Sequence, residues 1–200
     1  MINLNNVSEK QLMEMKMGLL QYDYIQKKFT QHIDDEDFRD VFTNFYLSSQ
    51  GRMRLPENRN PFFETMFECD PNIDLIDLVN YLYEVLAVDM YEFSFATKLL
   101  HTVNNQSPIY DSKVFKYLKK EERVDLWDIQ VPKKDRYGKE ISKIDKITNN
   151  WKRLNDWYRS FLPSSRGQKW IQWFDSNFPD YTHISDVKKI DFILFTCSGY

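Results

Sequence analysis

An aspartate behind a proline turn is the residue of this sequence whose position best suits chemistry. Asp111 follows Pro108 across a short segment and directly precedes a run with helical spacing that begins at Ser112. Proline fixes the backbone ahead of the aspartate, and a helix start holds an aspartate side chain in place. Such an arrangement can hold one acid against a sugar or a base. The competing interpretation is that Asp111 only caps the helix, as most aspartates at helix starts do.

A basic stripe follows Asp111. Lys113, Lys116 and Lys120 recur at spacings of three and four residues, so they share one helix face. The next polar segment surrounds Tyr137 with further cations, which are Lys133, Lys134, Arg136 and Lys139. Rows of this kind contact phosphates in nucleic-acid-binding proteins, although many are only solvated helix faces. DNA is therefore the partner that these residues predict, and a protein partner is the alternative.

The sequence predicts neither a metal site nor a cofactor. The acidic run 34–37 precedes an apolar helical pattern, where negative charge suits the helix dipole, and it lacks the glycine and distant glutamate of a calcium loop. Cys69 and Cys197 have no metal-ligand spacing, and isolated cysteines of this kind suit a reducing compartment. His101 stands near the end of a helical pattern, where a structural role is the simpler expectation.

Helical spacing of apolar residues covers most of the chain and predicts an all-α fold. With only 5 Gly and 7 Pro, the sequence has few residues that break helices. A capping-box pattern at residues 8–11 marks the first helix, which we expect to run for about five turns. Further helices are expected after 34–37 and near 61–69, 73–86, 93–103, 111–118, 147–162, 167–177 and 185–196. The segments 48–60 and 119–144 lack periodicity and predict surface loops.

Length and hydropathy predict one helical domain that spans residues 1–200. A chain of 200 residues with 42% hydrophobic content buries a sizeable core in a single domain. No apolar run approaches the roughly 20 residues that cross a bilayer, so no membrane partner is expected. The polar N-terminus lacks the pattern of a signal peptide, and we expect a cytoplasmic protein.

The net charge of −3 conceals an acidic half, 32–92, and a basic half, 93–200. The first carries a net charge of −10 and the second a net charge of +6. Such a division suits an acidic lobe and a basic lobe that face a polyanion. It equally suits two solvated faces whose charges interleave after folding, and the overall acidity counts against non-specific binding to nucleic acid.

The window 82–112 resembles the helix-hairpin-helix DNA glycosylases. In that family a helix ends in a tight hairpin, a second helix follows, and a Pro-x-Asp step or a close variant opens a third helix. The corresponding pieces here are LYEVLAVDMYEF, SFATKLLHTV and NNQSPIYDSKV. The resemblance implies an all-α glycosylase fold, without an iron–sulfur cluster because the cysteine cluster is absent. It also implies a hydrolase of the DNA-repair type that cleaves the N-glycosidic bond of a flipped nucleotide.

The resemblance assigns roles to three residues. Asp111 matches the family's aspartate, which stabilises the oxocarbenium-like sugar and orients the attacking water. Bifunctional members carry a lysine nucleophile near the position of Ser94, and Lys98, one turn further on, shares that helix face. Tyr110 is a candidate for the aromatic pocket that receives the flipped base, and Tyr117 or any of the five Trp are the alternatives.

The hairpin departs from the family pattern. Residues 87–90 contain no glycine, although close approach of backbone amides to a DNA phosphate favours glycine there. Asp89 also places a negative charge where the phosphate would lie. The sequence therefore leaves an alternative open, in which a DNA- or protein-binding helical module kept the scaffold and lost catalysis.

Overall fold

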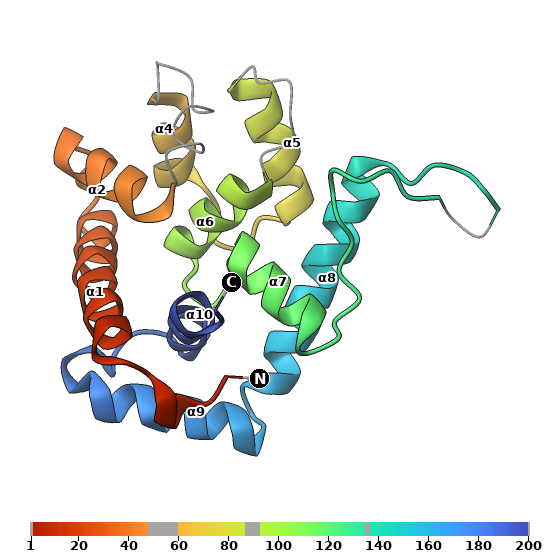
Figure 1. Cartoon of the computed structure of the whole chain (residues 1–200). Coiled ribbons are helices and arrows are strands. Elements are labelled where there is room, and N and C mark those ends of the chain that lie inside the picture. Colours follow the sequence, from red (N-terminus) through yellow and green to blue (C-terminus); the bar gives the residue numbers. More distant parts are fainter. Residues whose placement is uncertain (1, 48–59, 87–92, 135–136, 200) are drawn as a thin grey trace.

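The computed structural model of the chain describes residues 2–47, 60–86, 93–134 and 137–199 (Figure 1). Within these ranges the chain forms nine α-helices and two short 3-10 turns. An isolated bridge between Lys134 and Glu140 is the extent of β-pairing in the described residues. The all-α prediction is thus confirmed. None of the helices found in these ranges combines the length and the apolar character that crossing a bilayer demands.

The helices of the structure begin and end within a few residues of the predicted positions. The helices are α1 (Glu9–Thr30), α2 (Glu36–Tyr46), α4 (Asn60–Glu68), α5 (Leu75–Val85), α6 (Phe93–Val103), α7 (Ser112–Lys120), α8 (Lys143–Phe161), α9 (Ser165–Asn177) and α10 (Asp186–Cys197). The 3-10 turns are η1 (Leu4–Asn6) and η2 (Pro179–Tyr181). The predicted loop 48–60 and the hairpin 87–90 lie outside the described residues, apart from Asn60, which begins α4.

Side-chain caps explain where the helices begin. Ser8 forms the expected capping box with Gln11 at the start of α1, and the Asp35 carboxylate accepts from Phe38 N (2.8 Å), as expected of the acidic run. Helix α8 begins before the expected position 147 because the Ser142 hydroxyl accepts from Asp145 N. The Ser164 hydroxyl caps α9 in the same way, two residues before the expected start at Gly167.

The buried residues form two aromatic-rich clusters that lie side by side. One cluster belongs mainly to α2, α4, α5 and α6, and the other to α7, α8, α9, α10 and the first half of α1. Phe45, Tyr110 and Trp151 pack against both clusters. In Figure 1, α1 and α8 run along opposite sides of the molecule and connect the two groups of helices. Residues of both clusters therefore meet where the two clusters touch, and the candidate site lies there.

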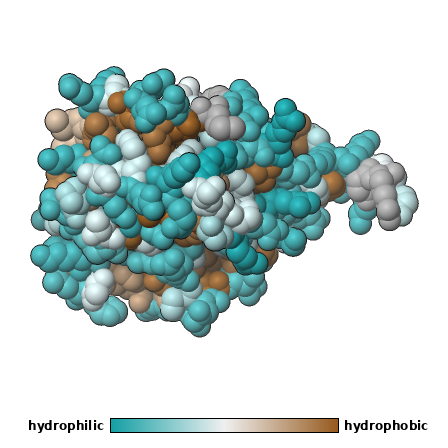
Figure 2. Space-filling view, turned by 90° about the horizontal axis from the view of Figure 1, so that it is seen from below, coloured by the Kyte–Doolittle hydropathy of each residue, from teal (hydrophilic) through white to brown (hydrophobic). Residues whose placement is uncertain are grey.

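The segment between α7 and α8 is a surface loop, as predicted, over its described residues. Two hydrogen bonds of 2.7 Å join the Asn150 side chain to the backbone of Trp127, and Lys146 Nζ donates to Val131 O (2.9 Å). Beyond these contacts the loop projects from the body beside α8, and Figure 2 shows mainly hydrophilic residues there. Tyr137 on this projection is 78% exposed.

Candidate functional site

Asp111 and Lys98 line one cavity of about 60 Å³ at the junction of α2, α6, α7 and α10. The structure thus brings together the two residues to which the glycosylase resemblance assigns catalysis. The cavity wall also contains a buried ion pair and four aromatic side chains, which are Lys188, Asp191, Phe45, Tyr46, Phe192 and Phe195. Charged groups of both signs therefore face a small space enclosed largely by rings.

Asp111 is both the cap of α7 and part of the cavity wall. Its Oδ1 accepts a hydrogen bond from Lys113 N (2.8 Å), which confirms the capping role. The carboxylate is close enough to Asp191 to contribute to the raised pKa of that group. Capping therefore occupies one oxygen of Asp111 while the side chain still faces a hollow.

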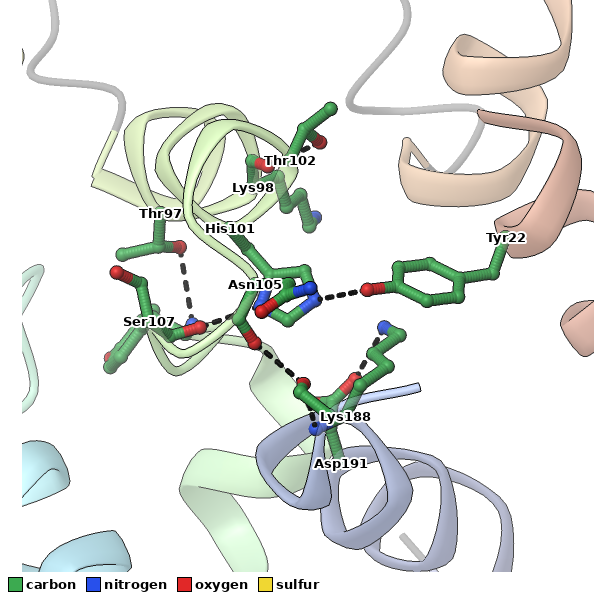
Figure 3. Close-up of polar contacts among 11 residues, drawn as sticks. Tyr22, Thr97, Lys98, His101, Thr102, Asn105, Ser107, Lys188 and Asp191 are labelled. Atoms are coloured by element: carbon green, nitrogen blue, oxygen red, sulfur yellow. Dashed lines mark hydrogen bonds and ion pairs between the residues drawn. The ribbon is translucent and has the colours of Figure 1, made fainter. Parts of the chain in front are cut away.

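Lys98 lies almost completely inside the protein, with 7% of its surface exposed. It extends from α6, and Figure 3 shows it beside His101. Its positive charge opposes the rise in the pKa of Asp191, so the two groups are electrostatically coupled. A reactant would have to enter the cavity to meet this ammonium, because the residue offers almost no surface to solvent.

The Lys188–Asp191 ion pair is a part of the site that the sequence reasoning missed. Lys188 Nζ lies 2.7 Å from Asp191 Oδ2, and the two side chains are only 3% and 8% exposed. Burial raises the pKa of Asp191 and the Lys188 charge opposes that rise. The available signal was a pair of opposite charges three residues apart inside the strongly apolar pattern 185–196.

Aromatic rings surround the Lys188 ammonium. Its Nζ lies between 4.8 and 5.3 Å from four ring centroids, those of Tyr22, Phe45, Tyr46 and Phe192. Contacts of this kind stabilise a cation that has lost its water shell. The aromatic side chains of the cavity wall therefore stabilise the positive charge of Lys188.

His101 belongs to a buried network beside the cavity (Figure 3). His101 Nδ1 lies 2.6 Å from Ser107 O, and Nε2 lies 3.1 Å from the Tyr22 hydroxyl. A carbonyl oxygen can only accept, so Nδ1 carries the proton and Nε2 accepts from Tyr22. Burial, with the nearby Lys188 charge, lowers the pKa of His101 to about 3. The imidazole is therefore neutral at physiological pH and holds α6 to α1.

Tyr110 is packed among other rings. Its centroid lies 4.3 Å from that of Phe93 and 5.6 Å from that of Phe115. The Tyr110 amide also donates to Thr97 Oγ1 (3.1 Å), which ties the residue to α6. These contacts occupy surfaces that a stacked base would need, and they connect the two aromatic clusters instead.

The predicted phosphate-binding residues occupy two places. On α7, Lys113 Nζ lies 4.3 Å from the Phe195 ring centroid, whereas Lys116 and Lys120 are on the exposed side of the helix. In the projecting loop, Lys133 Nζ lies 3.7 Å above the Trp127 ring and Lys134 is exposed. Arg136 lies outside the described residues. In Figure 1 the loop points away from α7, so the two groups do not form one continuous row.

The size of the cavity limits what it can hold. An apolar cavity that is known to accept benzene has a volume of about 150 Å³, and typical ligand pockets exceed about 300 Å³. At about 60 Å³ the Asp111 cavity is smaller than either, so a nucleobase does not fit in this conformation. In the described residues no group of three or more His, Cys, Asp or Glu side chains is arranged to hold a metal ion, and both cysteines are free.

Comparison of the chain with known proteins gives no match to a protein-family model, to a curated protein or to a solved structure. The resemblance to the helix-hairpin-helix glycosylases therefore rests on the window 82–112 alone.

Proposed function

We propose that this protein is a non-enzymatic helical module that binds nucleic acid, with α7 facing the phosphate backbone. One observation carries the proposal: α7 buries Val114, Tyr117 and Leu118 and turns lysines to the other side. Lys116 and Lys120 are exposed there, together with Lys119. Exposed lysines on one helix face can replace the counterions of a phosphate backbone.

The size and contents of the Asp111 cavity favour binding without catalysis. Base excision requires a pocket that holds the flipped base, and the cavity of about 60 Å³ is too small for one. Lys98 is buried, and Lys188 and Asp191 already neutralise each other beside it. On this proposal the charged cavity is a structural element, and the nucleic acid stays on the outer surface of α7.

A salt titration with charge-reversal variants tests the proposal. We expect fluorescence anisotropy with labelled DNA to give an affinity that falls steeply between about 50 and about 200 mM salt. Reversing Lys113, Lys116 and Lys120 together to Glu should weaken binding about 100-fold and make the salt slope shallower by about three. The physical reason is that each lost phosphate contact releases one counterion fewer.

Reversal of Lys10, Lys16 and Lys27 to Glu on α1 is the matched control, because it changes the net charge equally at another surface. It should weaken binding far less. Equal losses in the two triple variants would show that only net charge matters and would contradict the α7 interface. An absence of binding at about 50 mM salt would also overturn it and leave the protein-binding alternative.

A second candidate, the glycosylase itself, is favoured by the shared cavity of Asp111 and Lys98. The mouth of that cavity would have to open, and Phe195, which is 45% exposed, is the wall residue best placed to move. In this case Asp111→Asn should abolish base release from a damaged duplex but keep the cap, since asparagine also accepts at a helix start.

Borohydride trapping on an abasic duplex tests whether Lys98 is the nucleophile of the glycosylase candidate. An active Lys98 would give a covalent adduct that Lys98→Met loses and that Lys152→Met, at an exposed position on α8, keeps. If the wild-type protein yields no adduct, Lys98 has no nucleophilic role. If Asp111→Asn stays folded and still releases the base, the Asp111 side chain serves only as the cap of α7.

A further inference from the structure

Helix α1 carries a second apolar face on its solvent side. The face toward the core consists of four buried residues, which are Met15, Leu19, Tyr22 and Ile25. On the other side, Met13, Met17 and Leu20 are 62%, 55% and 50% exposed. A surface helix of a globular protein usually has one apolar face, so the packing of this chain does not account for the second one.

The exposed apolar residues of α1 form a row with regular spacing. Met13, Met17 and Leu20 are followed by the partly buried Tyr24, at spacings of four, three and four residues. Single exposed apolar side chains are ordinary, but a contiguous row marks an interaction surface, and this spacing is that of a two-stranded coiled coil. The exposed Lys10 and Lys27 end the row, which limits it to about three turns. Figure 1 shows α1 at an edge of the molecule.

The charges beside the row favour a second copy of α1 in antiparallel orientation. When Met17 lies opposite the partner's Leu20, Lys16 lies across from the partner's Asp23, and two-fold symmetry forms this contact twice. Lys16 is exposed and the Asp23 side chain is 49% exposed, so both are accessible to a partner. On the other flank, Glu14 faces the partner's Gln21, which is uncharged.

Other arrangements of two α1 helices bring like charges together. An antiparallel pair shifted by seven residues in one direction sets Lys16 opposite the partner's Lys16 and Glu14 opposite the partner's Glu14. A shift in the other direction sets Asp23 opposite the partner's Asp23, and a parallel pair sets Glu9 opposite the partner's Glu14. Because like charges across an interface are repulsive, the charge pattern selects a single register.

We propose that α1 is the interface of a homodimer in which two copies of the chain pair antiparallel through Met13, Met17 and Leu20. The apolar row leaves water on pairing, and the two Lys16–Asp23 contacts fix the register. Three turns of one helix make a small interface, so we expect a weak dimer with a Kd of about 10–100 µM. The inference does not depend on the proposed function of α7. Nucleic-acid titrations in a Met17→Glu background keep every variant monomeric, which leaves the α1 charge-reversal control matched.

Sedimentation equilibrium tests the dimer. Between about 5 and about 500 µM protein, the mass should rise from 24.3 kDa toward twice that value. Met17→Glu should stay monomeric throughout, because it places a carboxylate in the centre of the row. Tyr81→Glu, at a position on α5 that is 48% exposed, is the matched control and should dimerise as the wild type does. A monomeric wild type at about 500 µM, or equal dimerisation of Met17→Glu, would overturn the proposal.

A charge swap tests the register. Lys16→Asp and Asp23→Lys should each weaken the dimer about tenfold, because each variant makes two like-charge contacts. The double variant Lys16→Asp/Asp23→Lys should restore wild-type affinity. Positions 16 and 23 lie about 10 Å apart along one helix, so a recovery requires contact between two copies. A double variant as weak as the single ones would contradict the antiparallel pair.

Vesicles distinguish the dimer from a lipid surface, which is another partner for an exposed apolar helix face. The protein is mixed with vesicles of phosphatidylcholine and phosphatidylserine and sedimented. We expect it to remain in the supernatant. Co-sedimentation of the wild type that Met17→Glu loses, together with a monomeric wild type in the absence of vesicles, would assign the row to lipid and overturn the dimer.

Discussion

Replacing Lys188 with methionine should remove about 3–5 kcal/mol of folding stability at neutral pH. The reason is the partner that remains: Asp191 is 8% exposed at its side chain and would keep its charge without its ion-pair partner, with only the more distant charge of Lys98 to oppose it. The rings around Lys188 would pack well against methionine, so lost packing contributes little. Urea unfolding followed by circular dichroism measures the difference directly.

Two further variants separate the contribution of the ion pair to stability from the effect of any substitution in this region. The double variant Lys188→Met/Asp191→Leu should recover most of the loss, because removing both charges leaves no uncompensated group. Lys189→Met is the neighbouring control: its partners Asp175 and Asp186 are 33% and 49% exposed, so water can take over the role of the lysine. Equal losses in Lys188→Met and Lys189→Met would contradict the buried-pair explanation.

Acidification should reduce the deficit of Lys188→Met relative to the wild type. Burial raises the pKa of Asp191 above its ordinary value of 3.8, and the Lys188 charge opposes this rise, so the variant raises the pKa further. A folded-state pKa above the unfolded-state one means that the penalty appears as pH rises through the folded value. Lowering the pH protonates Asp191 in the folded variant and relieves that penalty.

The wild-type protein should lose stability on acidification through His101. Its pKa is about 3 in the folded state, far below the ordinary value of 6.5. Unfolding therefore takes up a proton below about pH 6.5, and each further pH unit removes about 1.4 kcal/mol of stability until the folded-state pKa is reached. Between pH 7 and pH 5 this single residue should account for about 2 kcal/mol.

The comparison with His101→Gln isolates this contribution. Glutamine cannot titrate, and it can still donate to Ser107 O or accept from Tyr22. The variant should therefore lose about 2 kcal/mol less than the wild type between pH 7 and pH 5. Asp191 titrates in both proteins, so its effect cancels in the difference. A ring-proton shift of His101 that moves with pH across this range would disprove the neutral imidazole.

Local sequence was sufficient for the helices and for several of their caps. The capping box of Ser8 and the cap at Asp35 use atoms only a few residues apart, so their chemistry is readable without a fold. The cap that Asp111 forms on α7, which is one of the two roles that the sequence leaves open for this residue, uses equally near atoms. Helix α9 begins two residues before the expected position 167, because the Ser164 side chain caps a helix in which Gly167 is the third residue.

Gly167 illustrates what local pattern cannot reveal. A Cβ at this position would lie 2.0 Å from Phe161 O, where the end of α8 meets the start of α9. The glycine is needed for that close approach of two backbones, and not for its effect on helix propensity. Only the tertiary structure shows which neighbour excludes a side chain.

The sequence by itself determined the all-α class, the helix that Asp111 caps and the lysine face of α7, because helix periodicity and capping depend on residues close together in the chain. The tertiary structure decided that Lys98 and Asp111 share a cavity, that Lys188 and Asp191 complete its wall, and that about 60 Å³ is left between them. These facts depend on how α6, α7 and α10 pack against one another. Packing brings together residues that are far apart in the chain, and local sequence patterns do not show which of them will touch.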